Sequence, residues 1–314
     1  MRKEEFSFGS RDGVTDLHAV MWVPKQENPL CILQIIHGMN EYIERYDAFA
    51  SYLAERGVLV VGDDHLGHGK SVPEGGTYGY FCENDPATVL VRDEHRLKKL
   101  VESKYPKTPY LIFGHSMGSF ILRNYITRYG SGIDGAIICG TGTPAEKELI
   151  AGSVVTWILG KLCGPRYVSR FVYQMTNRAY MDGKGKNCSE FDWICSDPDV
   201  VKAYGKDPLC GGFTFTVSAY HTLYELARRM KKKENMDKIP KKLPVLIVSG
   251  AEDPVGEKGV APKQLYDAYL NMDMTKVSLK LYNGARHEIL NEKIKETIYE
   301  ELYSWVEMIA VQGK

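Results

Sequence analysis

The sequence predicts an α/β protein, in which a mostly parallel central sheet has helices on both faces and an inserted helical cap. Short apolar runs alternate with helical patterns along the chain, as they do in folds built from β–α units. Several runs, such as residues 58–61, are continuous and rich in β-branched side chains, which is typical of strands buried on both faces. The alternation stops for roughly 100 residues in the middle of the chain, and this interruption indicates the cap.

The elements of the core follow in order along the chain. Each predicted strand is a short apolar run bounded by turn residues, and each predicted helix carries a helical pattern. The strands are expected at residues 17–23, 31–36, 58–62, 110–113, 135–139, 244–249 and 277–282. The helices are expected at residues 45–55, 87–103, 119–129, 262–270 and 292–311.

The middle of the chain is predicted to be helical. Helical patterns occur at residues 150–162, 168–179 and 216–233, separated by turns rich in Pro, Gly and Asp, and the strand pattern resumes at Leu243. We therefore expect a core formed by residues 1–140 and 243–314, with a cap formed by residues 141–242.

The pentapeptide Gly114-His115-Ser116-Met117-Gly118 gives the strongest chemical signal. It matches the G-x-S-x-G pattern and lies between a predicted strand and a predicted helix, which is the setting of a serine nucleophile. The flanking glycines allow the strand and the helix to approach closely around a strained turn. The alternative is a chance match in a glycine-containing turn. The strand–turn–helix context favours Ser116 as the nucleophile.

A second motif, His37-Gly38-Met39, follows the predicted strand at residues 31–36. Enzymes with such a serine place one oxyanion donor in this loop and another just after the nucleophile. We expect the backbone N–H groups of Met39 and Met117 to be these donors, and losing one costs about 100- to 1000-fold in rate. His37 is an alternative base, but the usual chain order of the catalytic residues favours a structural role.

The acid and the base are expected after the late strands, because the chain order in such enzymes is Ser, then Asp or Glu, then His. Asp253 follows the strand at residues 244–249 and is the predicted acid. Glu252 is its rival, and a plain Asp-Pro turn is the structural alternative. His287 is the predicted base, since no other histidine follows Asp253 in the sequence. Ser116 would then form an acyl-enzyme that water hydrolyses.

Two acidic residues and two histidines lie in the loop after residue 62, in the sequence Asp63-Asp64-His65-Leu66-Gly67-His68. They suggest a metal site, but metal-binding histidines on a helix usually lie four residues apart. These are three apart in a glycine-broken loop. We therefore favour a structural loop packed beneath the nucleophile turn, and we expect neither a metal nor a cofactor.

Together these motifs resemble the monoacylglycerol lipase and lysophospholipase group of the α/β-hydrolase superfamily, in its bacterial type. The resemblance covers about residues 5–140 and 241–310. It implies the α/β-hydrolase fold, a triad of Ser116, Asp253 and His287, and oxyanion donors at Met39 and Met117. The matching motifs occur in order at residues 37–46, 64–71, 114–118, 252–254 and 285–288.

The substrate pocket is where this resemblance is weakest. Asn40 and Tyr42 stand where the family commonly has a small residue and a histidine, and the cap is similar only loosely. Aromatic and methionine side chains in the cap suit an acyl chain, although most could form the cap's own core. The residues expected to contact substrate are Gly38, Asn40, His115, Trp157 and Phe213.

One predicted cap helix has an apolar face at helical spacing, formed by Val154, Trp157, Ile158 and Leu162. Such a face could contact a membrane or micelle transiently, and the basic run at residues 228–233 could contact anionic headgroups. Packing onto the core and a solvated helix end are the favoured interpretations of these two features.

Amino-acid composition limits the classes of partner and the cellular location that we expect. Lys plus Arg and Asp plus Glu each number 40, so we expect no nucleic-acid partner. The sequence contains neither a signal-peptide pattern nor a run of about 18 apolar residues. The seven cysteines are scattered and form no CxxC pair, which favours reduced thiols and a cytoplasmic location. The oligomeric state is left open.

The predicted function is therefore hydrolysis of carboxylic esters, namely monoacylglycerols, lysophospholipids or similar small esters of lipid metabolism. One alternative is an esterase for short-chain or aryl esters of the cinnamoyl or feruloyl type. Another is a proline-releasing aminopeptidase, which would need acidic cap residues to bind an amine. The candidates are Glu146, Glu148, Asp197 and Asp199. A non-catalytic binding module is disfavoured because all three triad residue types are present.

Overall fold

The computed structural model describes residues 1–177, 180 and 189–312. In these ranges eight strands form one sheet in the order β1-β2-β4-β3-β5-β6-β7-β8. Strands β3 to β8 run parallel to one another, whereas β2 pairs antiparallel with both β1 and β4. The strands are β1 Arg2–Gly9, β2 Asp16–Val23, β3 Cys31–Ile36, β4 Val58–Asp63, β5 Tyr110–His115, β6 Gly135–Cys139, β7 Val245–Gly250 and β8 Val277–Tyr282.

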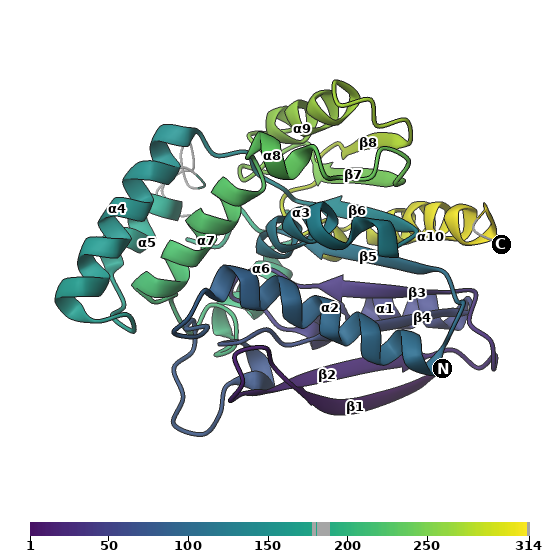
Figure 1. The fold of residues 1–314 in the computed structure, drawn as a ribbon, viewed down its shortest axis with the longest axis horizontal. Coiled ribbons are helices and arrows are strands. Elements are labelled where there is room, and N and C mark those ends of the chain that lie inside the picture. Colours follow the sequence, from purple (N-terminus) through teal and green to yellow (C-terminus); the bar gives the residue numbers. More distant parts are fainter. Residues whose placement is uncertain (178–179, 181–188, 313–314) are drawn as a thin grey trace.

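Helices lie on both faces of this sheet (Figure 1). One hydrophobic core contains side chains of α2, α3 and α9, and the other contains side chains of α1 and α10. The helices are α1 Asp47–Glu55, α2 Pro86–Lys104, α3 Met117–Tyr129, α4 Glu146–Cys163, α5 Arg170–Asn177, α6 Pro198–Lys206, α7 Val217–Arg229, α8 Lys233–Met236, α9 Val260–Leu270 and α10 Lys295–Gln312. The predicted α/β-hydrolase fold class, with its mostly parallel sheet, is confirmed.

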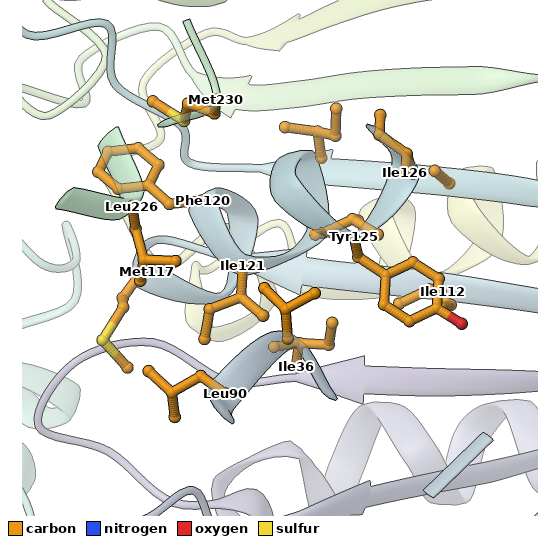
Figure 2. Close-up of a cluster of buried hydrophobic side chains, with 14 of the residues drawn as sticks. Ile36, Leu90, Ile112, Met117, Phe120, Ile121, Tyr125, Ile126, Leu226 and Met230 are labelled. Atoms are coloured by element: carbon orange, nitrogen blue, oxygen red, sulfur yellow. The ribbon is translucent and has the colours of Figure 1, made fainter. Parts of the chain in front are cut away.

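Helix α3 lies in the middle of one core and fixes the position of the residue before it, Ser116. Figure 2 shows Ile121 of α3 close to Ile36 of β3, among side chains from the sheet, α2 and α7. Ile36 and Ile121 are fully buried, and each such side chain contributes about 1.5–3 kcal/mol through burial. The start of α3 is therefore held firmly against the carboxyl end of the sheet.

Helices α4 to α8 lie between β6 and β7, all within the range 141–242 that the sequence predicts as the cap. They occupy one end of the sheet, and α4, α5 and α7 lie together there (Figure 1). Helices α4 and α7 pack closely at Gly152, where an added Cβ atom would lie 2.4 Å from the ring of Tyr224. The last two residues of the predicted helix 168–179, and Cys188, lie outside the described residues.

The outer face of α4 corrects one prediction. Its inner face buries Leu149, Gly152 and Thr156, and this contact turns the opposite side of the helix toward solvent. The side chains expected to pack onto the core are exposed instead: Val154 by 50%, Trp157 by 58%, Ile158 by 42% and Leu162 by 77%. In the described ranges of the chain, no helix has both the length and the apolar character needed to cross a membrane.

Candidate active site

Ser116 stands at the sharp turn between β5 and α3. Its backbone has φ 52° and ψ −119°, a strained conformation that costs on the order of 1–3 kcal/mol and occurs mainly at functional sites. The turn needs a glycine at 118, because a Cβ atom there would lie 2.1 Å from the carbonyl oxygen of Ile36. The N–H of Ser116 donates to the carbonyl of Cys139 at 3.0 Å. The serine is thereby fixed at the carboxyl ends of β5 and β6.

Asp253 and His287 meet in the same region, from the loops after β7 and β8. His287 Nδ1 lies 3.0 Å from Asp253 Oδ2, and Asp253 is completely buried. The carboxylate also accepts the Val255 N–H at 2.9 Å and the Ser249 hydroxyl at 3.2 Å. Burial alone would raise the pKa of Asp253, but the charge and hydrogen bond of His287 hold it below the ordinary value. Asp253 is therefore ionised and orients the imidazole.

The other ring nitrogen of His287 remains available for chemistry. His287 Nε2 is buried and has no hydrogen-bond partner among the described residues. With Nδ1–H donated to Asp253, the neutral ring carries its lone pair on Nε2. The ring lies against Gly140, the residue after β6, since an added Cβ atom at Gly140 would lie 3.1 Å from His287 Cε1. The carboxylate that faces His287 is that of Asp253 and not that of the rival acid Glu252. The backbone N–H of Glu252 donates to the carbonyl of Ala285.

The loop of residues 37–42, here called the HG loop, lies directly against the nucleophile. An added Cβ atom at Gly38 would be 2.9 Å from Ser116 Cβ, so glycine is required for this approach. Met117 is the first residue of α3, and the first N–H groups of a helix have no acceptor within the helix. Met39 follows Gly38 in the HG loop. Met117 therefore adjoins Ser116 in the chain, and Met39 follows the glycine that packs against Ser116.

Glu41 holds the HG loop in place, a role that sequence reasoning missed. Its Oε1 atom accepts the Gly38 N–H at 2.5 Å and the Tyr46 hydroxyl at 3.1 Å, and it lies 2.9 Å from His115 Nδ1. Burial would raise the pKa of Glu41, but the charges of His115 and Arg45 lower it to about 2. The only signal in the sequence was the position of an acidic residue inside the 37–46 motif.

His115 serves this buried network and is not among the described residues that line the cavity described below, although the sequence predicted it as a substrate contact. Its ring nitrogens face Glu41 Oε1 at 2.9 Å and the carbonyl oxygen of His287 at 3.3 Å. Burial lowers the pKa of His115, but the charge of Glu41 outweighs burial and raises it above the ordinary value. Both nitrogens can donate only when the ring is charged, so Glu41 and His115 form a buried ion pair.

The histidines of the two loops pack on one another. The rings of His37 and His65 are stacked with centroids 3.9 Å apart, and the His65 N–H donates to His37 Nε2 at 3.1 Å. Burial, together with the neighbouring His65 and His68, holds the pKa of His37 well below its ordinary value. His37 therefore stays neutral and joins the HG loop to the loop after β4.

Beside the HG loop lies a cavity of about 410 Å³, within the usual range of about 300–1,000 Å³ for small-molecule sites. Its lining is mixed: Met39, Phe191, Trp193 and Phe213 are apolar, whereas Asn40, Arg170, Asn177 and Glu190 are polar. Asn40 and Phe213, which the sequence predicted to contact substrate, line this cavity. Trp157 does not, because it is 58% exposed on α4 and is not among the described residues that line the cavity.

Trp193 connects this cavity to the base. Its ring centroid lies 5.0 Å from that of His287, with the planes inclined by 47°. The sequence showed that the cap is rich in aromatics, but the residue that reaches the base depends on how the cap folds.

The cap is fastened to the HG loop and its neighbours by direct contacts. The Asn40 side-chain amide donates to the carbonyl oxygens of Phe213 at 2.6 Å and Cys210 at 3.4 Å. The Tyr42 hydroxyl donates to Asp207 at 3.0 Å. Asn40 adopts φ 55°, a left-handed conformation that asparagine tolerates better than most residues. The departures from the family pattern at 40 and 42 thus coincide with cap contacts.

Comparison with known proteins places this geometry in context. A family model described as "Serine aminopeptidase, S33" matches residues 27–294. A monoacylglycerol lipase of Mycolicibacterium smegmatis is 27% identical over 308 residues, covering 97% of each chain. The mouse monoglyceride lipase is 26% identical, covering 91% of this chain and 84% of its own. A thermostable carboxyl esterase from Bacillus coagulans, solved in complex with glycerol, is 29% identical with a TM-score of 0.91 and covers 99% of both chains.

Proposed function

The chain belongs to the serine aminopeptidase S33 family of the α/β-hydrolase superfamily, and on this premise we propose that it hydrolyses small lipid esters such as monoacylglycerols. The nucleophile is Ser116, the base His287 and the acid Asp253. One observation carries the proposal: His287 is oriented by the buried Asp253 at 3.0 Å while its Nε2 has no partner in the described part of the chain. A strained serine at a strand–helix turn, together with a base oriented in this way, is what acyl transfer requires.

The reaction proceeds in two halves. Ser116 Oγ attacks the acyl carbon while His287 Nε2 takes its proton, and the charge of Asp253 stabilises the resulting imidazolium. The N–H groups of Met39 and Met117 bind the oxyanion. The alcohol leaves with the proton from His287, and water then attacks the acyl-enzyme with His287 again acting as base.

The mixed lining of the cavity supports an ester with an apolar acyl chain and a polar alcohol. Trp193 and Phe213 offer apolar surface, while Asn177 and Glu190 offer hydrogen-bonding groups. The Oδ1 atom of Asn177 is buried and has no partner among the residues that the structure describes, so a ligand hydroxyl there would satisfy it. The names of the relatives point the same way, since two are monoacylglycerol lipases and one esterase was solved with glycerol.

The aminopeptidase suggested by the family's description is less well supported. Such an enzyme would need acidic side chains free to bind the substrate amine. The Glu148 side chain accepts the Ala145 N–H at the start of α4, and Asp197 caps α6 by accepting the Asp199 N–H. Both carboxylates serve the ends of their own helices. The side chain of Glu146 is 58% exposed and lies 3.8 Å from Arg228.

We further propose that the outer face of the cap contacts lipid aggregates transiently. This apolar face consists of exposed side chains on α4 and the following segment, namely Ile150, Val154, Trp157, Ile158, Leu162, Tyr167 and Phe171. Lys161 lies on α4 in the same stretch of sequence, and a cation next to an apolar face favours an anionic lipid surface. The basic run at 228–233 has other contacts, since Arg229 pairs with Asp85.

Measuring kcat/KM across one substrate panel tests the proposed function. The panel contains 1-monoacylglycerols from C2 to C16, a lysophospholipid, a cinnamoyl ester and a prolyl amide, with Ser116→Ala as the inactive control. We expect the monoacylglycerols to be the best substrates and the prolyl amide to be inert. A preference for short-chain or aryl acyl groups would leave an esterase but overturn the lipid substrate. Faster cleavage of the prolyl amide would contradict ester hydrolysis as the function.

A further inference from the structure

A buried polar cluster beneath the HG loop has no part in the proposed reaction. Asp63 ends β4, His65 follows two residues later, and Glu94 lies on α2. Asp63 is 0% exposed, and His65 and Glu94 are each 1% exposed. One potential ligand atom from each side chain lies within 4.8 Å of the others. The sequence favoured a structural loop because the two histidines are three residues apart in a glycine-broken loop. Glu94 is distant in the chain, and only the fold brings it to Asp63 and His65.

The outer atoms of the cluster are held by the surrounding protein. Glu94 Oε2 accepts the Gln34 amide at 2.6 Å, and Gln34 Oε1 in turn accepts the Tyr110 hydroxyl at 2.6 Å. His65 Nε2 lies 3.1 Å from the carbonyl oxygen of His37. A carbonyl can only accept, so Nε2 carries the hydrogen and the neutral ring has its lone pair on Nδ1. Metal-binding histidines commonly have this outer contact to a carbonyl or carboxylate.

The inner atoms face one another and lack ordinary partners. Both carboxylate oxygens of Asp63 and the Oε1 atom of Glu94 are buried, and none accepts a hydrogen bond from an N–H or hydroxyl group of the described residues, although the carboxyl groups of Asp63 and Glu94 are close enough to share a proton. His65 Nδ1 lies 3.2 Å from Glu94 Oε1 and 3.6 Å from Asp63 Oδ2. Ligand atoms at about 2.0–2.1 Å from a tetrahedral Zn²⁺ are about 3.3–3.4 Å apart. The two measured separations lie on either side of this value.

Charge also requires a balancing group at this position. Two carboxylates in a low-dielectric interior are unfavourable unless cations or protons neutralise them. Within the described ranges, neither Asp63 nor Glu94 forms an ion pair with a lysine or arginine. A divalent cation would balance both carboxylates and would use the Nδ1 lone pair of His65. Two added protons are the competing solution.

We propose that Asp63, His65 and Glu94 bind one Zn²⁺ ion in a structural site beneath the HG loop. One nitrogen and carboxylate oxygens are ligands that Zn²⁺ accepts. Because the His65 ring is stacked on His37 at 3.9 Å, the ion would stiffen the floor of the HG loop. It lies outside the reaction path and takes no part in the chemistry at Ser116.

Metal analysis of the purified protein tests the site. The protein is prepared without chelators or metal-affinity resin, and its bound metal is measured by inductively coupled plasma mass spectrometry. We expect about one equivalent in the wild type and less than about a tenth in Asp63→Asn and in Glu94→Gln. Asp93→Asn is the matched control. Asp93 is also buried on α2, but its carboxylate accepts hydrogen bonds from the Ser10 hydroxyl and the Arg11 backbone N–H. This control variant should keep the full equivalent.

A reconstitution experiment keeps the proposal testable if a variant fails to fold. Wild-type protein is unfolded in chelator, refolded after its removal, and titrated with Zn²⁺ while the thermal midpoint is recorded. A rise in midpoint that saturates at one equivalent supports the site. The absence of both bound metal and a Zn²⁺-dependent rise would overturn it. Glu94→Gln with an unchanged or higher midpoint would also overturn it, because an amide mimics a protonated carboxyl but does not replace a metal-bound carboxylate.

Discussion

The ionised form of Asp253 is stabilised by the groups that donate hydrogen bonds to its carboxylate. Three groups donate to its carboxylate: His287, the Ser249 hydroxyl and the Val255 N–H. Together they keep the pKa of Asp253 below its ordinary value although the side chain is buried. An amide at this position would have the same shape but would lose the charge that stabilises the imidazolium.

We predict that Asp253→Asn lowers kcat/KM for an ester substrate by about 10⁴-fold, because the amide favours the wrong tautomer of His287. Steady-state kinetics of both variants provide the test, with Glu252→Gln as the matched control. Glu252→Gln should retain wild-type activity, because His287 is hydrogen-bonded to Asp253 and not to Glu252. A larger loss in Glu252→Gln than in Asp253→Asn would show that the acid has been misassigned.

Glu41 should make stability depend on pH in a definite direction. Its pKa of about 2 lies below the ordinary value of 4.5, because His115 and Arg45 outweigh the effect of burial. The stability that ionised Glu41 contributes is therefore complete above about pH 4.5 and is lost as the pH falls toward about 2. His115, whose pKa is raised, contributes stability that is present below its ordinary pKa and lost as the pH rises through the higher value.

Urea unfolding of Glu41→Gln between pH 7 and pH 3 tests this assignment. We expect the variant to be less stable by about 3–5 kcal/mol at neutral pH, since breaking a buried pair leaves a charge without its partner. The difference from wild type should shrink as the pH falls. Glu27→Gln, at an exposed position, should follow the wild-type curve. A constant difference at every pH would contradict the role assigned to Glu41.

At the level of elements, burial decides which parts the sequence could predict. All seven predicted strands are present, and six of them are apolar runs buried in the sheet, whereas β8 is an edge strand of alternating partly buried and exposed residues. Strand β1 was missed because it is an edge strand with mostly charged or exposed residues, and pairing with β2 is what defines it. Helix α6 was missed although Asp197 caps it and Pro198 begins it, because its nine residues carry too short an apolar pattern.

The sequence predicts Ser116 from its motif and Asp253 and His287 from chain order, and the structure brings Asp253 and His287 together. The residues around them were not predictable, because their partners come from distant segments. Glu41 meets His115, and Glu94 meets Asp63, only after the sheet has formed. The orientation of α4 could not be predicted either, because helical spacing defines an apolar face but does not determine whether that face is buried or exposed.

Packing between α4 and α7 leads to a prediction about two glycines of one helix. At Gly152 an added Cβ atom would lie 2.4 Å from Tyr224 Cζ, whereas at Gly160 the nearest atom would be 3.9 Å away. Gly152→Ala should therefore destabilise the protein by about 1–3 kcal/mol through overpacking. Gly160→Ala should stabilise it by up to about 1 kcal/mol through helix propensity. Thermal or urea unfolding of both variants distinguishes these outcomes, and equal effects would contradict the close α4–α7 contact.

On the scale of the whole molecule, the cap has two faces with different tasks. Its inner side lines the cavity next to His287 with Trp193 and Phe213. Its outer side exposes Trp157 and Leu162 on α4, and such an apolar patch usually marks an interaction surface. Under the proposed function, this arrangement would bring an insoluble ester on a lipid surface close to the pocket.

The double variant Trp157→Glu/Leu162→Glu tests this arrangement. Burying one such side chain is worth about 1.5–3 kcal/mol, so activity on emulsified long-chain monoacylglycerol should fall by about tenfold or more. The kcat/KM for a soluble acetate ester should stay unchanged, because neither side chain lies in the cavity. Val311→Glu, which alters an apolar residue 60% exposed on α10, is the control and should affect neither substrate. An equal loss on both substrates would point to a damaged cap.

The contacts of Asn40 and Tyr42 with the cap bear on how such enzymes can be recombined. Their partners are the backbone carbonyls of Phe213 and Cys210 and the carboxylate of Asp207. A cap grafted from a relative onto this core would have to offer acceptors at the same three points in space. Chimeras that exchange residues 141–242 alone would lose these bonds, whereas chimeras that also carry over the donor's own residues at positions 40 and 42 would keep matched surfaces. In this protein the practical unit of exchange is therefore the cap together with residues 40 and 42 of the HG loop.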